Sequence, residues 1–409
     1  MEPEPNRTAL FLASCVALVA TSMSFAIRGD IMADFENVFL LSKQNVGWVS
    51  GAAFWGFGLS IFIGGPLCDA LGMGNILRLA AAGHIGGTLL TIIAPNFWVL
   101  FLATLLIGIA NGLVEAACNP LIATIYPEQK TRKLTVFHAW FPGGIAIGGL
   151  LCVALNLAGY SSAEAPGGWK IKMALLLVPS VLYAAMIVGM RFPATERKAA
   201  GVSGGQMVKA VVTKPLFLLV FVCMWLTAAT ELGPGQWITN IYNEVMQSTT
   251  GSGILLLVWG NGLMWALRQF GGGIAHRFSP VGLIAFTAPF AAAGLYLCNI
   301  ASTPLIWFVA SGLLYFGVSF WWPSMLGITS ERFPRTGALG LAIIGGTGSI
   351  STAVAGPVMG WLNDTYGADR VLPIWSMLPV VLFVVFLTFY LVDRSRGGYR
   401  IEKISQSAE

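Results

Sequence analysis

Charged side chains are scarce in this chain: Asp, Glu, Lys and Arg together make up 10% of its 409 residues, against 56% hydrophobic residues. Soluble proteins carry about 25% charged residues, so this chain has too few to cover a water-facing surface. Long apolar runs recur from one end of the sequence to the other. The composition therefore excludes a soluble protein and indicates one that is embedded in a bilayer.

The residue types that build catalytic and metal centres are also scarce. The chain has three histidines, and no HExxH pair, Ser/His/Asp order or phosphate-binding glycine loop stands at a sensible place. The six cysteines lie singly in apolar runs without the spacing of metal ligands. We therefore expect free structural thiols, no enzymatic activity, no metal and no cofactor. The cysteines are Cys15, Cys68, Cys118, Cys152, Cys223 and Cys298.

The apolar runs divide into about twelve segments, each close to the roughly 20 residues that cross a bilayer as a helix. The 49 glycines and 20 prolines suit a helical bundle, in which small residues let backbones approach. We predict an all-α polytopic membrane protein. The predicted spans are 8–32, 44–67, 75–94, 97–122, 132–158, 170–191, 214–238, 251–275, 280–300, 303–329, 337–361 and 371–393.

Basic residues are distributed unevenly between the loops that join these spans. Seventeen of the 23 would face the cytoplasm if the N-terminus does, and four would face the opposite side: Lys43, Lys170, Lys172 and Arg370. The positive-inside rule then predicts that both termini are cytoplasmic. The net charge of +5 reflects this bias and needs no nucleic acid. The first apolar segment lacks a signal-peptide cleavage site, so we expect it to remain as the first span.

A polar segment at 192–213 divides the chain into an N-terminal half, 1–191, and a C-terminal half, 214–409, of six spans each. An internal echo supports a duplication, because the glycine-rich end of the second span (64–72) resembles that of the eighth (271–278). Two pseudo-symmetric six-helix halves around a central cavity are the layout from which alternating access arises.

The end of the second span resembles the loop signature of the major facilitator superfamily. Small residues there let two helices touch, and Asp69 can cap a neighbouring helix and, with Arg78, latch one conformation. The family's usual basic residues are absent at Ala70, Met73 and Gly74, which predicts a weaker latch. The signature consists of Gly65, Leu67, Asp69 and Gly72, followed by Arg78.

Further motifs along nearly the whole chain resemble the fucose-galactose-glucose:proton symporters within that superfamily. This resemblance implies the major facilitator fold and proton-coupled uptake of a sugar. The motifs are Asp30-Ile31-Met32 with Phe35, Glu115 to Pro120, Trp259-Gly260 with Arg268 and Gly271-Gly272, Trp322-Pro323, and Gly345-Gly346 with Gly356-Pro357, Met359-Gly360 and Asp364.

Isolated acids in apolar spans are costly and usually mark an ion or substrate path. Asp30 and Glu115 match the two acids to which the resemblance assigns proton coupling and sugar recognition. A low-dielectric surrounding disfavours a charged carboxylate, so Glu115 can take up a proton outside and release it inside. Asp30 can accept hydrogen bonds from sugar hydroxyls. The alternative is that either acid forms a permanent structural pair with Arg28.

Two residues, Arg28 and His138, leave alternatives open. Arg28 lies two positions from Asp30, on another helix face; it either snorkels or pairs structurally, takes part in coupling, or binds a charged substrate. His138 stands where the related family has Gln, and Phe141 where it has Asn, which puts fucose itself in doubt. His138 is therefore either a ligand in the cavity or a buried histidine that bonds a backbone carbonyl.

In the C-terminal half, Glu231 precedes the run Gly233-Pro234-Gly235-Gln236-Trp237, which predicts a break in the seventh helix and a hinge or gate near the solute. Arg268 either snorkels or pairs with a buried acid, for which Glu231 is the candidate. Amide and aromatic side chains that could contact a sugar complete the predicted site: Gln236, Trp237, Trp259, Asn261, Trp265, Trp321 and Trp322.

The sequence thus predicts a carrier of the bacterial inner membrane that takes up a monosaccharide or sugar derivative with protons and works as a monomer. Two alternatives stay open for the solute, which can also be an acidic sugar or a small organic anion. The coupling ion can be sodium instead of a proton. A non-transporting nutrient receptor would bind the same solute without flux.

Overall fold

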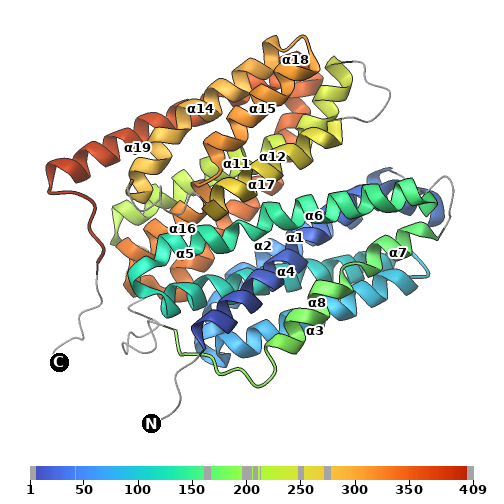
Figure 1. The fold of residues 1–409 in the computed structure, drawn as a ribbon, viewed down its shortest axis with the longest axis horizontal. Helices are drawn as coiled ribbons and strands as arrows, with labels where there is room; N and C mark the ends of the chain where they lie inside the picture. Colours follow the sequence, from blue (N-terminus) through green and yellow to red (C-terminus); the bar gives the residue numbers. More distant parts are fainter. Residues whose placement is uncertain are drawn as a thin grey trace. The chain divides into compact units, whose positions relative to one another are not determined.

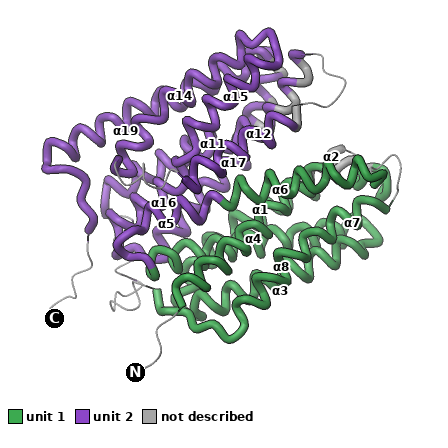
Figure 2. Tube along the Cα trace, viewed as in Figure 1, with its two compact units in different colours: residues 1–125, 140–199 green, residues 126–139, 200–409 purple. Residues whose placement is uncertain are grey.

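The computed structural model describes residues 6–41, 43–160, 167–195, 205, 211, 213–246, 253–270 and 278–402, and within these ranges it contains helices and turns but no strand (Figure 1). The all-α prediction is confirmed. The chain separates into two compact units (Figure 2). Unit 1 comprises residues 1–125 and 140–199, and unit 2 comprises residues 126–139 and 200–409.

Unit 1 is a bundle in which α2 packs extensively on α4, α4 on α3, and α1 on α6. The side chain of Asn6 caps α1 by accepting a hydrogen bond from the backbone N–H of Ala9. Gly72 separates α2 from α3 with a φ of 86°, a conformation that favours glycine. The helices are α1 (Arg7–Val38), α2 (Lys43–Leu71), α3 (Met73–Ile93), α4 (Phe97–Ile125), α6 (Trp140–Leu155), a π-helical turn (Asn156–Tyr160), α7 (Gly168–Ala174) and α8 (Leu177–Met186).

Unit 2 is a second bundle, in which α14 packs on both α15 and α19, and α11 packs on α17. Its helices are α5 (Lys130–His138), α11 (Pro215–Val245), α12 (Gly253–Phe270), α14 (Pro280–Ile300), α15 (Pro304–Val318), α16 (Trp321–Arg332), α17 (Gly337–Tyr366), α18 (Ala368–Trp375) and α19 (Met377–Ser395), with short 3-10 turns at Pro127–Gln129 and Pro334–Thr336.

Eleven helical segments in the described part of the chain are long and apolar enough to cross a membrane. The eighth predicted span, 251–275, is not among them. It corresponds to α12 (Gly253–Phe270), and residues 271–277 lie outside the described residues. The glycine-rich echo predicted at 271–278 therefore falls almost wholly outside them, as does most of the predicted linker, 192–213.

The predicted break of the seventh helix at Gly233-Pro234-Gly235 is wrong. Helix α11 runs from Pro215 to Val245 with Pro234 inside it. A proline removes one backbone hydrogen bond, and packing against neighbouring helices tolerates this in a membrane bundle. Here a Cβ on Gly233 would lie 3.3 Å from the Cβ of Ala355, and Trp375 donates a hydrogen bond to the carbonyl of Ala229.

Glycines determine how closely α2 and α4 approach each other. A Cβ built on Gly108 would lie 2.3 Å from the carbonyl oxygen of Ala53, and one on Gly56 would lie 2.7 Å from that of Leu105. A Cβ on Gly112 would lie 2.3 Å from the carbonyl oxygen of Phe57. Both backbones therefore touch, as small residues permit in membrane helices.

We expect Gly108→Ala to lower stability by about 1–3 kcal/mol, because the added methyl group forces α2 and α4 apart. Thermal unfolding of the purified protein in detergent measures the effect. The matched control is Gly51→Ala in α2, where a Cβ meets nothing within 4 Å. An equal loss of stability in both variants would contradict close packing at Gly108.

Candidate functional site

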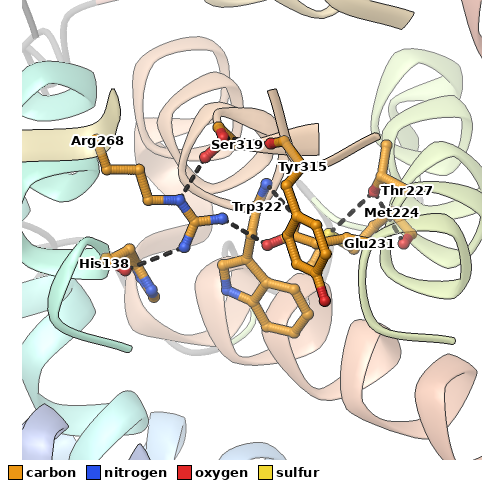
Figure 3. Close-up of polar contacts among 8 residues, drawn as sticks. All are labelled: His138, Met224, Thr227, Glu231, Arg268, Tyr315, Ser319 and Trp322. Atoms are coloured by element: carbon orange, nitrogen blue, oxygen red, sulfur yellow. Dashed lines mark hydrogen bonds and ion pairs between the residues drawn. The ribbon is translucent and has the colours of Figure 1, made fainter. Parts of the chain in front are cut away.

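Glu231 and Arg268 form an ion pair inside unit 2 (Figure 3). Glu231 lies on α11 and Arg268 on α12, and their Oε1 and Nη2 atoms are 2.5 Å apart. Their side chains are 4% and 2% exposed, respectively. Of the two sequence-based alternatives for Arg268, the structure shows the pair with Glu231 and not a snorkelling side chain.

Backbone groups complete the coordination of this pair. Arg268 donates from Nε to the carbonyl of Ser319, and from Nη1 to the carbonyl of His138 at 3.0 Å. The second oxygen of Glu231 accepts the backbone N–H of Trp322 at 3.2 Å. Both charged groups therefore have several partners, which is how a buried pair offsets the loss of hydration. The pair ties α5, α11, α12 and the start of α16 together.

Two aromatic side chains beside this pair have polar atoms without a hydrogen-bond partner. Tyr315 and Trp322 are 3% and 7% exposed, and neither the Tyr315 hydroxyl nor the Trp322 indole N–H has a partner. The Tyr315 ring lies against Gly260, where a Cβ would come within 2.1 Å of it, and its hydroxyl lies 3.6 Å from a Cβ built on Gly235. Buried polar atoms of this kind are uncommon, and a ligand is one explanation.

The other residues predicted for this half lie on the same helices. Asn261 is buried on α12, and its amide donates to the carbonyl of Leu257 at 2.8 Å. Trp265 packs edge-on against Phe270, and Trp237 is half-buried on α11. Gln236 lies in α11, but its side chain is outside the described residues. Trp259 is exposed and donates to the carbonyl of Phe308.

In unit 1, Asp30 pairs with Lys172 and not with Arg28. The Oδ2 atom of Asp30 is 2.6 Å from the Nζ atom of Lys172, and Oδ1 accepts the amide of Asn156 at 3.3 Å. The Lys172 side chain is 2% exposed. The sequence analysis placed Lys172 on the non-cytoplasmic side and missed it as a partner. The sequence did contain an indication of this pair, because Lys172 lies at the start of the sixth predicted span and Asp30 at the end of the first. Both ends face the same side of the membrane in the predicted topology.

Arg28 is buried on α1, at 6% exposure, and forms no ion pair within the described residues. Its Nη2 atom has no hydrogen-bond partner. Its guanidinium lies 5.1 Å from the centre of the Phe25 ring, a cation–π contact. Arg28 therefore does not snorkel, and it does not form the structural pair with an acid that the sequence left open.

Glu115 is 3% exposed on α4, and its Oε2 atom accepts the amide of Asn119, one helical turn later, at 2.8 Å. Phe141, on α6, is half-buried and packs on Phe25 with a centroid distance of 5.9 Å. His138 ends α5 and is 1% exposed. Its carbonyl accepts from Arg268, and its imidazole lies beside the Phe137 ring.

A buried network around His84 was missed by the sequence analysis. Its Nε2 is 2.7 Å from the Asn111 side-chain oxygen, and its Nδ1 is 2.8 Å from the Tyr183 hydroxyl. Asn111 donates in turn to Ser24 at 3.0 Å. In the neutral tautomer with the proton on Nε2, the imidazole donates to the amide oxygen of Asn111 and accepts from the phenol of Tyr183. The network joins α1, α3, α4 and α8, so we assign it to stability.

The two residues predicted as a latch make separate contacts. Asp69, at the end of α2, accepts a hydrogen bond from Thr195. Arg78, on α3, donates to Asn75 at 2.7 Å and lies over the Phe192 ring. Asp69 thus contacts the segment after α8, and Arg78 contacts the same segment through Phe192. Their role as a latch stays a prediction.

A second group of charged residues surrounds the end of α16 in unit 2. Arg332 pairs with Asp393 and lies 4.4 Å from the centre of the Tyr399 ring, while Glu331 accepts the Thr131 hydroxyl at 2.6 Å. Burial, with Glu331 nearby, raises the pKa of Tyr399 well above its ordinary value of about 10, so this phenol stays neutral. The described residues contain no cluster of His, Cys, Asp and Glu that could hold a metal.

We expect Glu231→Gln to destabilise the protein by about 3–5 kcal/mol, because it leaves the Arg268 charge buried without its partner. Glu231→Gln combined with Arg268→Gln should cost less than the sum of the two single changes. Thermal unfolding of the four proteins gives this double-mutant cycle.

The control for that cycle is Glu402→Gln. Glu402 pairs with Lys214 at 3.3 Å, but their side chains are 50% and 42% exposed, and an exposed pair contributes about 0–1 kcal/mol. If Glu231→Gln and Glu402→Gln lower the unfolding temperature equally, the buried pair does not have the stabilising role assigned to it here.

Structures of known transporters share this fold. The Escherichia coli fucose:proton symporter superimposes with a TM-score of 0.77 at 17% identity, and the superposition covers 93% of this chain and 98% of that chain. A proton:xylose symporter gives 0.75 at 15% identity, covering 94% and 95%. The human organic anion transporter MFSD10 gives 0.73 at 13% identity, covering 94% and 100%. At these identities the likeness concerns the fold alone.

Alignments with curated relatives cover less of the chain than the structural superpositions do. The D-xylose transporter of Levilactobacillus brevis is 28% identical over 42% of this chain, and the gentisate transporter of Corynebacterium glutamicum is 23% identical over 43%. These alignments span only 35% and 39% of the relatives' own lengths. A probable sugar efflux transporter of Haemophilus influenzae is 23% identical over 76% of both chains.

The family comparison covers most of the sequence. The model of the Major Facilitator Superfamily matches residues 10–335. It agrees with the helical fold and with the resemblance found in the sequence motifs, and this family consists of transporters, not enzymes. The chain is a multi-pass membrane protein that belongs to the major facilitator superfamily.

Proposed function

We propose that this protein is a secondary active transporter that takes up a monosaccharide or sugar derivative together with protons by alternating access. It works in the inner membrane as a monomer, with both termini in the cytoplasm. Fold and family support transport in general. Residues of unit 2 support the sugar, and residues of unit 1 support the coupling ion.

The observation that carries the sugar assignment is the group beside the buried pair of unit 2. Tyr315 and Trp322 each present a hydrogen-bonding atom that has no partner among the described residues, next to an aromatic face. A sugar offers hydroxyls to such atoms and C–H faces to such rings. The Glu231–Arg268 pair fixes the backbone of Trp322 through its N–H. The pair therefore orients the site even where it does not touch the solute.

Proton coupling requires an acid that exchanges its proton within the membrane span. Glu115 is the candidate, because it is 3% exposed in an apolar helix and accepts a hydrogen bond from the neutral amide of Asn119. An amide can donate to a carboxylate and its oxygen can accept from a protonated carboxyl, so this neighbour suits both states. Asp30 already holds Lys172 and Asn156, so its part in binding a solute depends on oxygens that these bonds leave available.

Tyr315→Phe tests the sugar site without removing a protein contact. Because the hydroxyl has no partner in the structure, its loss should leave the unfolding temperature unchanged or slightly higher. We expect sugar binding to weaken by about 2- to 10-fold, the value of one net hydrogen bond. Isothermal titration of the detergent-purified protein with neutral monosaccharides measures this.

The matched control is Tyr242→Phe, which removes the hydroxyl of another buried tyrosine of unit 2, packed edge-on against Trp307. Its sugar affinity should equal that of the unmodified protein. Equal affinities in all three proteins would remove Tyr315 from the binding site. Binding without flux in vesicles would identify a receptor instead of a carrier.

Glu115→Gln tests the coupling. In proteoliposomes with an inward proton gradient, we expect the variant to equilibrate the solute without accumulating it, since the exchanging proton is gone. Counterflow of labelled against unlabelled solute should persist. The control is Glu128→Gln, at an exposed position just after α4, which should accumulate solute normally.

Two results would contradict this role. If counterflow disappears together with accumulation, Glu115 serves binding or structure. If accumulation persists in the variant, another group carries the proton. Replacing sodium by potassium on both sides separates the coupling ions, because a proton symporter keeps its accumulation and a sodium symporter loses it.

A further inference from the structure

Arg28 is a buried cation of unit 1 that has no carboxylate partner among the described residues. It is 94% buried and makes no ion pair within the described residues, and its Nη2 atom lacks a hydrogen-bond partner. Unpaired charges in a membrane span are rare and costly. In contrast, Lys172 in the same unit has a carboxylate at 2.6 Å. The burial of Arg28 therefore indicates a partner other than the described residues.

The guanidinium contacts one ring of an aromatic cluster. It lies over Phe25, and Phe25 packs on Phe54, Phe57 and Phe141 with centroid distances of 5.3, 6.0 and 5.9 Å. A ring face attracts a cation but cannot replace a hydrogen-bonded anion. The rings of this cluster come from α1, α2 and α6, and the Nη2 atom of Arg28 keeps no hydrogen-bond partner among the described residues.

The helix surface next to Arg28 is open to solvent at Gly29. Gly29, the next residue on α1, is exposed, and a Cβ built on it meets nothing within 4 Å. Phe25, Phe54 and Phe141 are each partly exposed. The aromatic cluster therefore reaches the surface of unit 1 and can contact a ring-shaped solute while the guanidinium binds its charged group.

Resting on the proposed function, we propose that the transported sugar carries a carboxylate and that Arg28 binds this carboxylate, so that the solute is a monocarboxylic sugar acid. A planar guanidinium donates two parallel hydrogen bonds to a carboxylate. One arginine balances one negative charge. A phosphate carries about −1.5 to −2 charges near neutral pH and would keep part of its charge uncompensated at this position.

The charged group and the ring of such a solute fit different side chains of unit 1. Its carboxylate matches the Nη2 donor of Arg28 that has no described partner, and its ring matches the phenylalanine cluster beside it. Phe141 in this cluster has no hydrogen-bonding group and can only pack on the ring of the solute. A charge-assisted hydrogen bond is about twice as strong as a neutral one, so the carboxylate is expected to contribute most of the polar recognition here.

The experiment compares binding of D-glucuronate, D-glucose and 2,5-dihydroxybenzoate to the full-length protein in detergent by isothermal titration. We expect the unmodified protein to prefer glucuronate to glucose. Arg28→Gln should weaken glucuronate binding by about 10- to 100-fold, the loss of a charge-assisted hydrogen bond, and leave glucose binding unchanged. Arg28→Lys should give an intermediate loss, because it keeps the charge and loses the planar fork.

Lys170→Gln is the matched control, since it removes an exposed positive charge of the same unit, from a side chain that lies over the Trp169 ring. It should bind glucuronate as the unmodified protein does. Unchanged glucose binding by Arg28→Gln shows that this variant is folded. Should Arg28→Gln fail to fold, the comparison of Arg28→Lys with the unmodified protein still measures the contribution of the fork.

The outcomes separate this proposal from the broader one. If the unmodified protein binds glucose as tightly as glucuronate, or Arg28→Gln binds both acids unchanged, the carboxylate assignment is overturned while sugar transport stands. If 2,5-dihydroxybenzoate binds through Arg28 and neither D-glucose nor D-glucuronate binds, the solute is not a sugar. Arg28 then recognises the carboxylate of a different class of solute. If no acid binds, the inference is rejected.

Discussion

The balance of buried charges is the constraint on which the two bundles depend. A charged side chain that leaves water inside a membrane protein loses several kcal/mol of hydration free energy, which only an opposite charge and well-placed hydrogen bonds recover. Glu231 and Arg268 meet this condition through four partners, three of them backbone groups. Because those backbone groups belong to α5, α15–α16 and α16, the pair also sets the relative positions of helices within unit 2.

The same constraint explains why polar residues outside the proposed site are also tied together. His84, Asn111, Tyr183 and Ser24 form a hydrogen-bonded network without a carboxylate, lysine or arginine. Such a network joins helices without the hydration penalty of ions. It shows that a buried polar residue in this protein is not by itself a sign of function. What separates Arg28, Tyr315 and Trp322 from this network is a polar atom that has no protein partner.

The helices were predictable from the sequence because long apolar runs have few other structures available in a bilayer. Their continuity was less predictable. Pro234 and its flanking glycines suggested a break, but contacts of Gly233 with α17 and of Ala229 with Trp375 hold α11 together. The Glu231–Arg268 pair could be proposed because each residue is isolated in an apolar span. The Asp30–Lys172 pair could not, since its partners are 142 residues apart and Lys172 lies near a span end, where a lysine usually reaches water.

Arg28 and Arg268 are both buried arginines, but only one is suited to bind an anion from solution. An anion that approached Arg268 would first have to displace Glu231, and breaking a buried pair costs about 3–5 kcal/mol. Arg28 has no such partner, so its strongest interaction is still available when a solute arrives. The Phe25 ring keeps the guanidinium in place meanwhile, which reduces the entropy that binding must overcome. A carrier also has to release its solute. In the described part of the aromatic cluster, Arg28 has no second cation beside it. A single charge-assisted contact can therefore recognise a carboxylate without binding it too tightly for release.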